Sequence, residues 1–242
     1  MPMPPKPVLG TVPNGTAGPA ASVRDVLFPR HSLSATEFLI VLNIAVAIVL
    51  AVVWKTDYPS NLRAWADDAW AAVAADRAYG WWLPTIFLHA GPGHLARNMI
   101  ALLAASGAVE FVAGGRWSVA VYVITGLGAA AVSYLGHNAP PLSVGASGAI
   151  MGLFGCIVTF VIRRRREFNY AQQWKVWRVY VPLFVLFLLP VIVNADVHAH
   201  AGGFACGLVL GLWLPSHPRV RALAAVDPLA EDAEEPEQLI DP

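Results

Sequence analysis

The chain has 242 residues, of which 57% are hydrophobic and only 13% charged, and its mean hydropathy is +0.55. This composition excludes an ordinary soluble domain and is typical of a protein that crosses the membrane several times. The formal net charge is zero, and we expect no nucleic-acid partner. The two cysteines, Cys156 and Cys206, fall inside apolar runs, which indicates buried thiols rather than a redox or zinc-ribbon motif.

Apolar runs predict an all-α polytopic membrane protein with six transmembrane helices. The first run, residues 38–54, is uncharged and is at the short end of a spanning helix. A cleaved signal peptide is the alternative, but the leader is long and Trp-Lys-Thr-Asp is no small-residue cleavage site. The five further spans are predicted at about residues 94–112, 117–135, 146–162, 176–193 and 197–214.

Three parts of the chain follow from these runs. We expect a disordered cytoplasmic tail over residues 1–34, a six-span domain over 35–216, and an acidic disordered cytoplasmic tail over 217–242. The loop after the first span carries aromatic residues of the type found at membrane interfaces, including Trp65, Trp70, Tyr79, Trp81 and Trp82, and short amphipathic helices are expected between residues 62 and 78. A folded soluble loop is the alternative there.

The distribution of Lys and Arg predicts the orientation. With the N-terminus inside, the inside segments hold twelve Lys and Arg residues and the outside loops hold three. Both termini are therefore expected in the cytoplasm. Since the N-terminal segment reads as no organellar presequence, we expect the protein in a bacterial plasma membrane.

A polar constellation appears when this topology is applied. The second, fourth and sixth spans all run from outside to inside, so His94, Asn98, Ser147 and His200 are predicted at one depth near the outer surface. Ionisable groups in a membrane are costly and usually functional. A serine that an imidazole deprotonates, beside donors for an oxyanion, is the set that acyl transfer needs.

The individual residues also permit structural interpretations. Ser147 lies in the glycine-rich run Gly145 to Gly155 and is compatible with helix packing alone, and Asn98 with a hydrogen bond between helices. A metal site of His89, His94 and His200 is a further alternative. There is no H-E-x-x-H motif and no aspartate deep in a span, so zinc-dependent and aspartyl intramembrane proteases are disfavoured. We expect no metal and no cofactor.

Three separated stretches resemble the rhomboid family of intramembrane serine proteases. Residues 87–99 contain His94-Leu-x-x-Asn98, residues 145–148 read Gly-Ala-Ser-Gly, and residues 199–207 read Ala-His-x-x-Gly-x-x-x-Gly. Glu110, followed by Gly114 and Arg116, is similar to a further structural motif. The resemblance covers about residues 38–214.

The resemblance implies a role for each matched position. Ser147 would be the nucleophile and His200 the general base of a dyad, with His94, Asn98 and the Ser147 N–H forming the oxyanion hole. The site-supporting positions would be Gly145, Gly148, Gly203, Gly207 and Glu110. Such an enzyme is a hydrolase that cleaves single-pass membrane proteins within or beside their spans through an acyl-enzyme.

Two positions depart from the family pattern, and two other functions stay open. Met151 stands where an aromatic often packs against the base, and Arg97 stands where apolar residues are common. An inactive rhomboid-like protein that binds membrane clients is one alternative, and a small transporter or scaffold is another. The retention of all four polar residues favours the protease.

Overall fold

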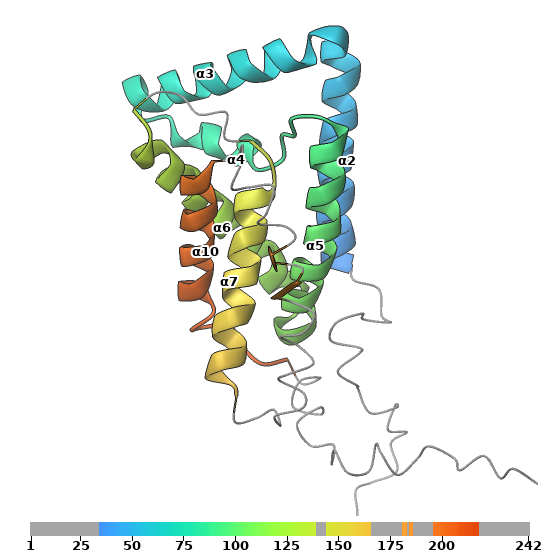
Figure 1. The fold of residues 1–242 in the computed structure, drawn as a ribbon, viewed down its shortest axis with the longest axis vertical. Coiled ribbons are helices and arrows are strands. Elements are labelled where there is room, and N and C mark those ends of the chain that lie inside the picture. The colour runs from blue at the N-terminus through green and yellow to red at the C-terminus, as the bar shows by residue number, and fades with distance from the viewer. Residues whose placement is uncertain (1–33, 139–143, 166–180, 183, 186–195, 218–242) are drawn as a thin grey trace, which may run out of the picture.

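The computed structural model describes residues 34–138, 144–165, 181–182, 184–185 and 196–217 (Figure 1). Within these ranges the regular structure is helical and no strand occurs. The predicted fifth span at residues 176–193 lies almost wholly outside the described residues, as do nearly all residues of the two predicted tails. The described residues therefore test five of the six predicted spans.

Five apolar helices form the bundle, and each corresponds to a predicted span. Their bounds are α2 Ser34–Trp54, α5 Pro92–Ala113, α6 Gly115–Gly136, α7 Ser147–Arg163 and α10 Val197–Leu210. Within the described ranges, α2, α5 and α6 are long and apolar enough to cross a membrane, and α7 and α10 are apolar but shorter. The sixth span is predicted to end at about residue 214, but α10 ends four residues earlier, at Leu210. The chain tightens there into i→i−3 turns at Leu212 and Trp213, ahead of Pro215.

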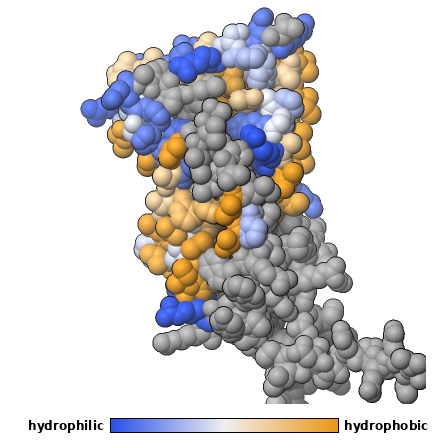
Figure 2. Space-filling view, in the orientation of Figure 1, coloured by the Kyte–Doolittle hydropathy of each residue, from blue (hydrophilic) through white to orange (hydrophobic). Residues whose placement is uncertain are grey.

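The apolar surface of the bundle fits a lipid environment. On the face shown in Figure 2, hydrophobic side chains cover the middle of the bundle and hydrophilic ones gather over α3. Helix α2 exposes large apolar residues along its length, including Val41, Ile48 and Val52. Exposed apolar surface of this extent is unfavourable in water and favourable in lipid. The chain is an integral membrane protein.

The segment between α2 and α5 is mostly helical, with one long helix where short amphipathic helices are predicted at residues 62–78. It comprises η1 Lys55–Asp57, α3 Tyr58–Asp76, η2 Tyr79–Trp81 and α4 Trp82–Thr85. The buried residues of α3 are Leu62, Ala66, Ala69 and Val73, whose four-three-four spacing makes one apolar stripe. Figure 1 shows α3 lying across the end of the bundle at which α5, α7 and α10 begin.

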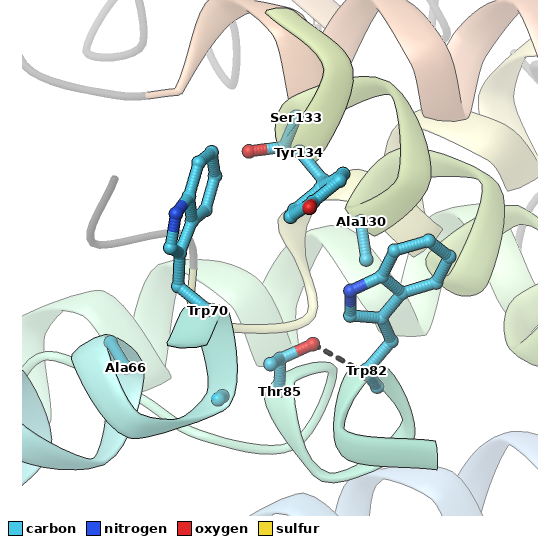
Figure 3. A pocket seen from close by; sticks show the side chains of 8 residues that line it. Ala66, Trp70, Trp82, Thr85, Ala130, Ser133 and Tyr134 are labelled. Atoms are coloured by element: carbon cyan, nitrogen blue, oxygen red, sulfur yellow. Dashed lines mark hydrogen bonds between the residues drawn. The ribbon is translucent and has the colours of Figure 1, made fainter. Parts of the chain in front are cut away.

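Aromatic side chains fasten α3 and α4 to the end of α6. The rings of Trp70 and Tyr134 are 4.6 Å apart, and those of Trp82 and Tyr134 are 6.0 Å apart. Figure 3 shows these three side chains around a small cavity that Thr85 and Ser133 also line. The amphipathic segment is thus packed against the spans.

Helices α7 and α10 pack at backbone contact. A Cβ on Gly203 would lie 2.0 Å from the carbonyl oxygen of Gly148, and one on Gly207 would lie 1.9 Å from that of Gly152. No side chain fits at those separations, so glycine is required for this approach. These glycines are the positions at which the fourth and sixth predicted spans come into contact.

Glu110 closes the opposite end of the bundle. Its Oε1 accepts a hydrogen bond from the Ala35 N–H (3.1 Å), and its Oε2 accepts from the Thr36 N–H (2.8 Å) and hydroxyl (2.7 Å). The Thr36 hydroxyl is in turn hydrogen-bonded to Ser106, and Ser106 to Ser118. A carboxylate at this position satisfies amide groups that the start of α2 leaves unpaired.

Candidate active site

Ser147 and His200 meet where α7 and α10 begin. The Ser147 Oγ and the His200 Nε2 are 2.8 Å apart, a hydrogen-bond distance. Ser147 is the first residue of α7, and His200 lies in the first turn of α10 and is buried. The glycine contacts between the two helices allow side chains from separate spans to approach this closely.

The proton positions follow from the partners of the imidazole. When Nε2 accepts from the Ser147 hydroxyl, the neutral ring carries its proton on Nδ1. Among the described residues, Nδ1 has no hydrogen-bond partner. The nearby Asp196 carboxylate is engaged elsewhere, since it accepts from the Ser133 hydroxyl and from the Ala199 N–H. The described residues therefore present a serine–histidine pair rather than a triad.

Gly145 lies in the short segment of residues 144–146 that leads into Ser147, called the serine loop below, and holds it against α5. Its φ of +103° is a conformation that residues with a side chain rarely adopt, and its N–H donates to the Thr85 carbonyl at 3.0 Å. A Cβ at this position would lie 2.9 Å from His94 Cε1 and 3.2 Å from Asn98 Nδ2. Because glycine has no side chain, the serine loop can come this close to both His94 and Asn98.

His94 and Asn98 are one turn apart on α5 and both reach Gly145. The His94 Nδ1 accepts from the Ala90 N–H at 3.3 Å, so in the neutral ring Nε2 carries the proton and is free to donate. The Asn98 side chain is 1% exposed, and its Nδ2 has no hydrogen-bond partner among the described residues. A buried amide donor without a partner is rare and calls for an explanation.

His89 supports this wall of the site from the loop before α5. Its ring packs edge-on to His94 with centroids 5.4 Å apart, and its Nδ1 donates to the Phe87 carbonyl at 3.1 Å. Burial, and to a smaller extent the adjacent His94, lower the pKa of His89 to about 4. His89 is therefore neutral at physiological pH.

Residues 77–217 match the family model described as the Rhomboid domain. The chain belongs to the rhomboid family. Members of that family include proteins named rhomboid proteases.

Curated relatives agree with this assignment. The chain is 33% identical over 143 residues to RHOMBOID-like protein 5 of Arabidopsis thaliana, covering 55% of this chain and 43% of the relative. It is 30% identical over 129 residues to rhomboid protease GluP of Bacillus subtilis (52% and 25%) and 30% identical over 134 residues to the protein named putative rhomboid protease YdcA of the same organism (54% and 65%). The match spans less than two thirds of the length of each.

The structure of this rhomboid separates the histidines that the sequence left as alternatives. Among the described residues, His89, His94 and His200 do not form a group whose ligand atoms converge on one point. His198 is exposed and its ring lies against Gly136 of α6. Met151 is buried and Arg97 is exposed.

Sequence reasoning missed the groups that hold the two loops beside the site, the loop before α5 and the loop before α7. The Tyr58 hydroxyl donates to the His89 carbonyl at 2.6 Å and ties α3 to the loop before α5. The Thr85 carbonyl, at the end of α4, holds Gly145. Two of these contacts are made by backbone carbonyls, which carry no sequence signal, and Tyr58 is one of many aromatics in its segment.

Proposed function

We propose that this rhomboid is an active serine endopeptidase that cleaves single-pass membrane proteins within or beside their spans. The observation that carries the proposal is the 2.8 Å contact between Ser147 Oγ and His200 Nε2. A hydroxyl hydrogen-bonded to an imidazole nitrogen is the pair that nucleophilic catalysis by serine requires.

The proposed reaction begins when Ser147 Oγ attacks the carbonyl carbon of the scissile peptide while His200 Nε2 takes the hydroxyl proton. The tetrahedral intermediate collapses as the imidazolium protonates the leaving amine, which gives an acyl-enzyme. A water molecule, deprotonated by His200, then hydrolyses the ester and restores Ser147. The new carboxyl terminus and the amine fragment are the two products.

The oxyanion of each intermediate needs preorganised donors. We assign this role to the Asn98 Nδ2 group, the His94 Nε2–H and the Ser147 backbone N–H. The unpaired state of Asn98 Nδ2 supports the assignment, because a donor kept for the transition state has no protein partner in the free enzyme. The N-terminal end of α7, where Ser147 is the first residue, adds positive potential.

The placement in the membrane belongs to the same proposal. Helices α5, α7 and α10, which carry the proposed catalytic residues, start at the end of the bundle covered by α3. We propose that this end faces outward and admits water. The six-span domain at 35–216, with both termini in the cytoplasm of a bacterium, remains the arrangement we favour on the Lys and Arg distribution.

A cleavage assay in proteoliposomes tests the proposal. Purified wild type, Ser147→Ala, His200→Ala and the double variant would each be mixed with a reporter carrying one transmembrane segment. We expect cleavage by the wild type, none above background by either single variant, and no further loss in the double variant, because the two groups act as one unit. Cleavage by Ser147→Ala would overturn the proposal, whereas a folded but inert wild type would favour the client-binding alternative.

A further inference from the structure

A second cluster of ligand-type side chains lies outside the serine–histidine pair. His137, just after α6, meets Asp196 and His198 at the start of α10, and one ligand atom of each lies within 4.8 Å of the others. The two imidazole rings are in edge-to-face contact with centroids 4.6 Å apart. The catalytic account uses none of these three side chains.

The hydrogen bonding of His137 prepares its ring for a metal. Its Nδ1 contacts the Ser133 carbonyl at 2.9 Å, and because a carbonyl only accepts, Nδ1 carries the proton. The lone pair of the neutral ring is then on Nε2, which lies 4.0 Å from Asp196 Oδ1. Histidines that bind metals usually donate the other ring N–H to a backbone carbonyl or carboxylate in this way.

Asp196 is held in place from two sides. Its Oδ2 accepts from the Ser133 hydroxyl and its Oδ1 accepts from the Ala199 N–H at 3.0 Å, so the carboxylate caps α10 while Oδ1 faces His137. Its side chain is only 7% exposed. A ligand fixed by second partners loses little conformational freedom on binding an ion.

The backbone at the end of α6 makes room for the third ligand. A Cβ on Gly136 would lie 2.3 Å from Cδ2 of His198, so the imidazole ring lies in the space that a larger residue at position 136 would occupy. The adjacent pair Gly136-His137 thus places one histidine and accommodates another. The 4.0 Å gap between His137 Nε2 and Asp196 Oδ1 is too long for a hydrogen bond, and it is slightly wider than the roughly 3.3 Å between ligands of a tetrahedral zinc ion with bonds of about 2.0 Å.

We propose that His137, Asp196 and His198 bind a zinc ion that clamps the end of α6 to the start of α10. Two imidazoles and one carboxylate are the ligands that zinc takes, with water in the fourth position, whereas calcium and magnesium prefer oxygen ligands alone. This proposal revises the expectation from the sequence that the chain binds no metal. It does not depend on the proposed protease activity.

The clamp has a physical consequence for the enzyme. Asp196 begins the turn that contains His200, since its carbonyl accepts from the His200 N–H at 3.1 Å. Fixing Asp196 to His137 joins two helices whose sequence separation is large, and an ion that binds only the folded protein stabilises it by mass action. Zinc should therefore raise the melting temperature in proportion to its occupancy.

The test uses the full chain in detergent after treatment with a chelator. We would titrate zinc by calorimetry and follow thermal unfolding for wild type, His137→Ala, His198→Ala, His217→Ala and His200→Ala. We expect one zinc per chain and a saturable rise in melting temperature in the wild type, in His217→Ala, which removes a histidine near the other end of the bundle, and in His200→Ala. Both effects should be lost in His137→Ala and His198→Ala, and calcium and magnesium should have no effect on the wild type.

Cobalt substitution gives an independent readout on the wild type, in case a variant fails to fold. Cobalt bound to two imidazoles, a carboxylate and water should show the visible absorption of a tetrahedral ion, and zinc should displace it. Absence of stoichiometric binding by the wild type, an octahedral cobalt spectrum, or binding that survives both His137→Ala and His198→Ala would overturn the proposal. So would loss of binding in His200→Ala, because the ion would then occupy the catalytic histidines.

Discussion

The Glu110 network and the Ser147 site, at opposite ends of the bundle, treat their polar groups in opposite ways. At one end both carboxylate oxygens of Glu110 are hydrogen-bonded, and the hydroxyls of Thr36, Ser106 and Ser118 continue the network. At the other end, Asn98 Nδ2, His200 Nδ1 and His89 Nε2 are buried without a partner among the described residues. A satisfied network holds helices together, whereas an unpaired donor such as Asn98 Nδ2 beside a nucleophile is available to a reacting substrate.

The largest effect on turnover should come from the end of the bundle that carries Ser147 and His200. Asn98→Ala removes a donor that acts on charge developing in the transition state, so we expect turnover to fall by about 10²–10³, or roughly 3–4 kcal/mol, while the apparent KM changes little. Steady-state kinetics on a reporter substrate measure this. A raised KM with normal turnover would show that Asn98 binds substrate rather than the oxyanion. Asn98→Asp serves as the matched control, because it keeps the shape but offers no amide donor.

At the Glu110 end, a substitution should lower stability and leave turnover unchanged. Glu110→Ala leaves the Ala35 and Thr36 amides without their acceptor, and we expect a loss of about 2–4 kcal/mol in unfolding free energy with normal turnover in the protein that remains folded. Glu110→Gln should lose less, since its side-chain oxygen still accepts. Thermal unfolding in detergent beside active-site titration separates the two quantities. A folded Glu110→Ala protein with impaired turnover would break the distinction between the ends.

The glycine contacts between α7 and α10 should affect both stability and cleavage. Gly207→Ala places a methyl group where only 1.9 Å separates it from the Gly152 carbonyl oxygen, so we expect a loss of about 2–3 kcal/mol and reduced cleavage as His200 moves from Ser147. Gly207→Val should be worse, and Gly211→Val, which lies further from the site, should reduce stability more than turnover. Gly80→Ala is the control, because nothing lies within 4 Å of its added methyl group. Wild-type melting and cleavage in Gly207→Ala would contradict this packing.

The smallest effect concerns the neutral His89. Its pKa of about 4 in the folded chain is below the roughly 6.5 of an unfolded histidine, so between these values only the unfolded chain takes up the proton. Stability should therefore fall as pH drops from 6.5 towards 4, by up to about 2 kcal/mol at pH 5. His89→Gln should flatten this part of the stability–pH curve. Parallel curves for His89→Gln and wild type would show that His89 is not held neutral.

Much of the site could be predicted from the sequence, because long apolar runs locate the helices and short motifs locate the polar residues on them. Helices α5, α7 and α10 all begin at the same end of the bundle (Figure 1), and this brings His94, Asn98, Ser147 and His200 together there. Contacts between distant segments were not predictable. Glu110 was expected only as a structural residue, and its role as the cap of α2 depends on a contact across 74 residues. His137 and Asp196 likewise meet only because α6 and α10 pack side by side.

Covalent labelling of Ser147 tests the central claim most directly. A fluorophosphonate probe forms a bond to a serine oxygen only when a neighbouring base activates the hydroxyl, and peptide mapping by mass spectrometry identifies the serine that carries it. We expect the probe on Ser147 in the wild type, its loss in Ser147→Ala and His200→Ala, and its persistence in Glu110→Gln at a temperature where that variant is folded. An unlabelled wild type, or equal labelling of Ser147 in His200→Ala, would contradict a serine activated by His200.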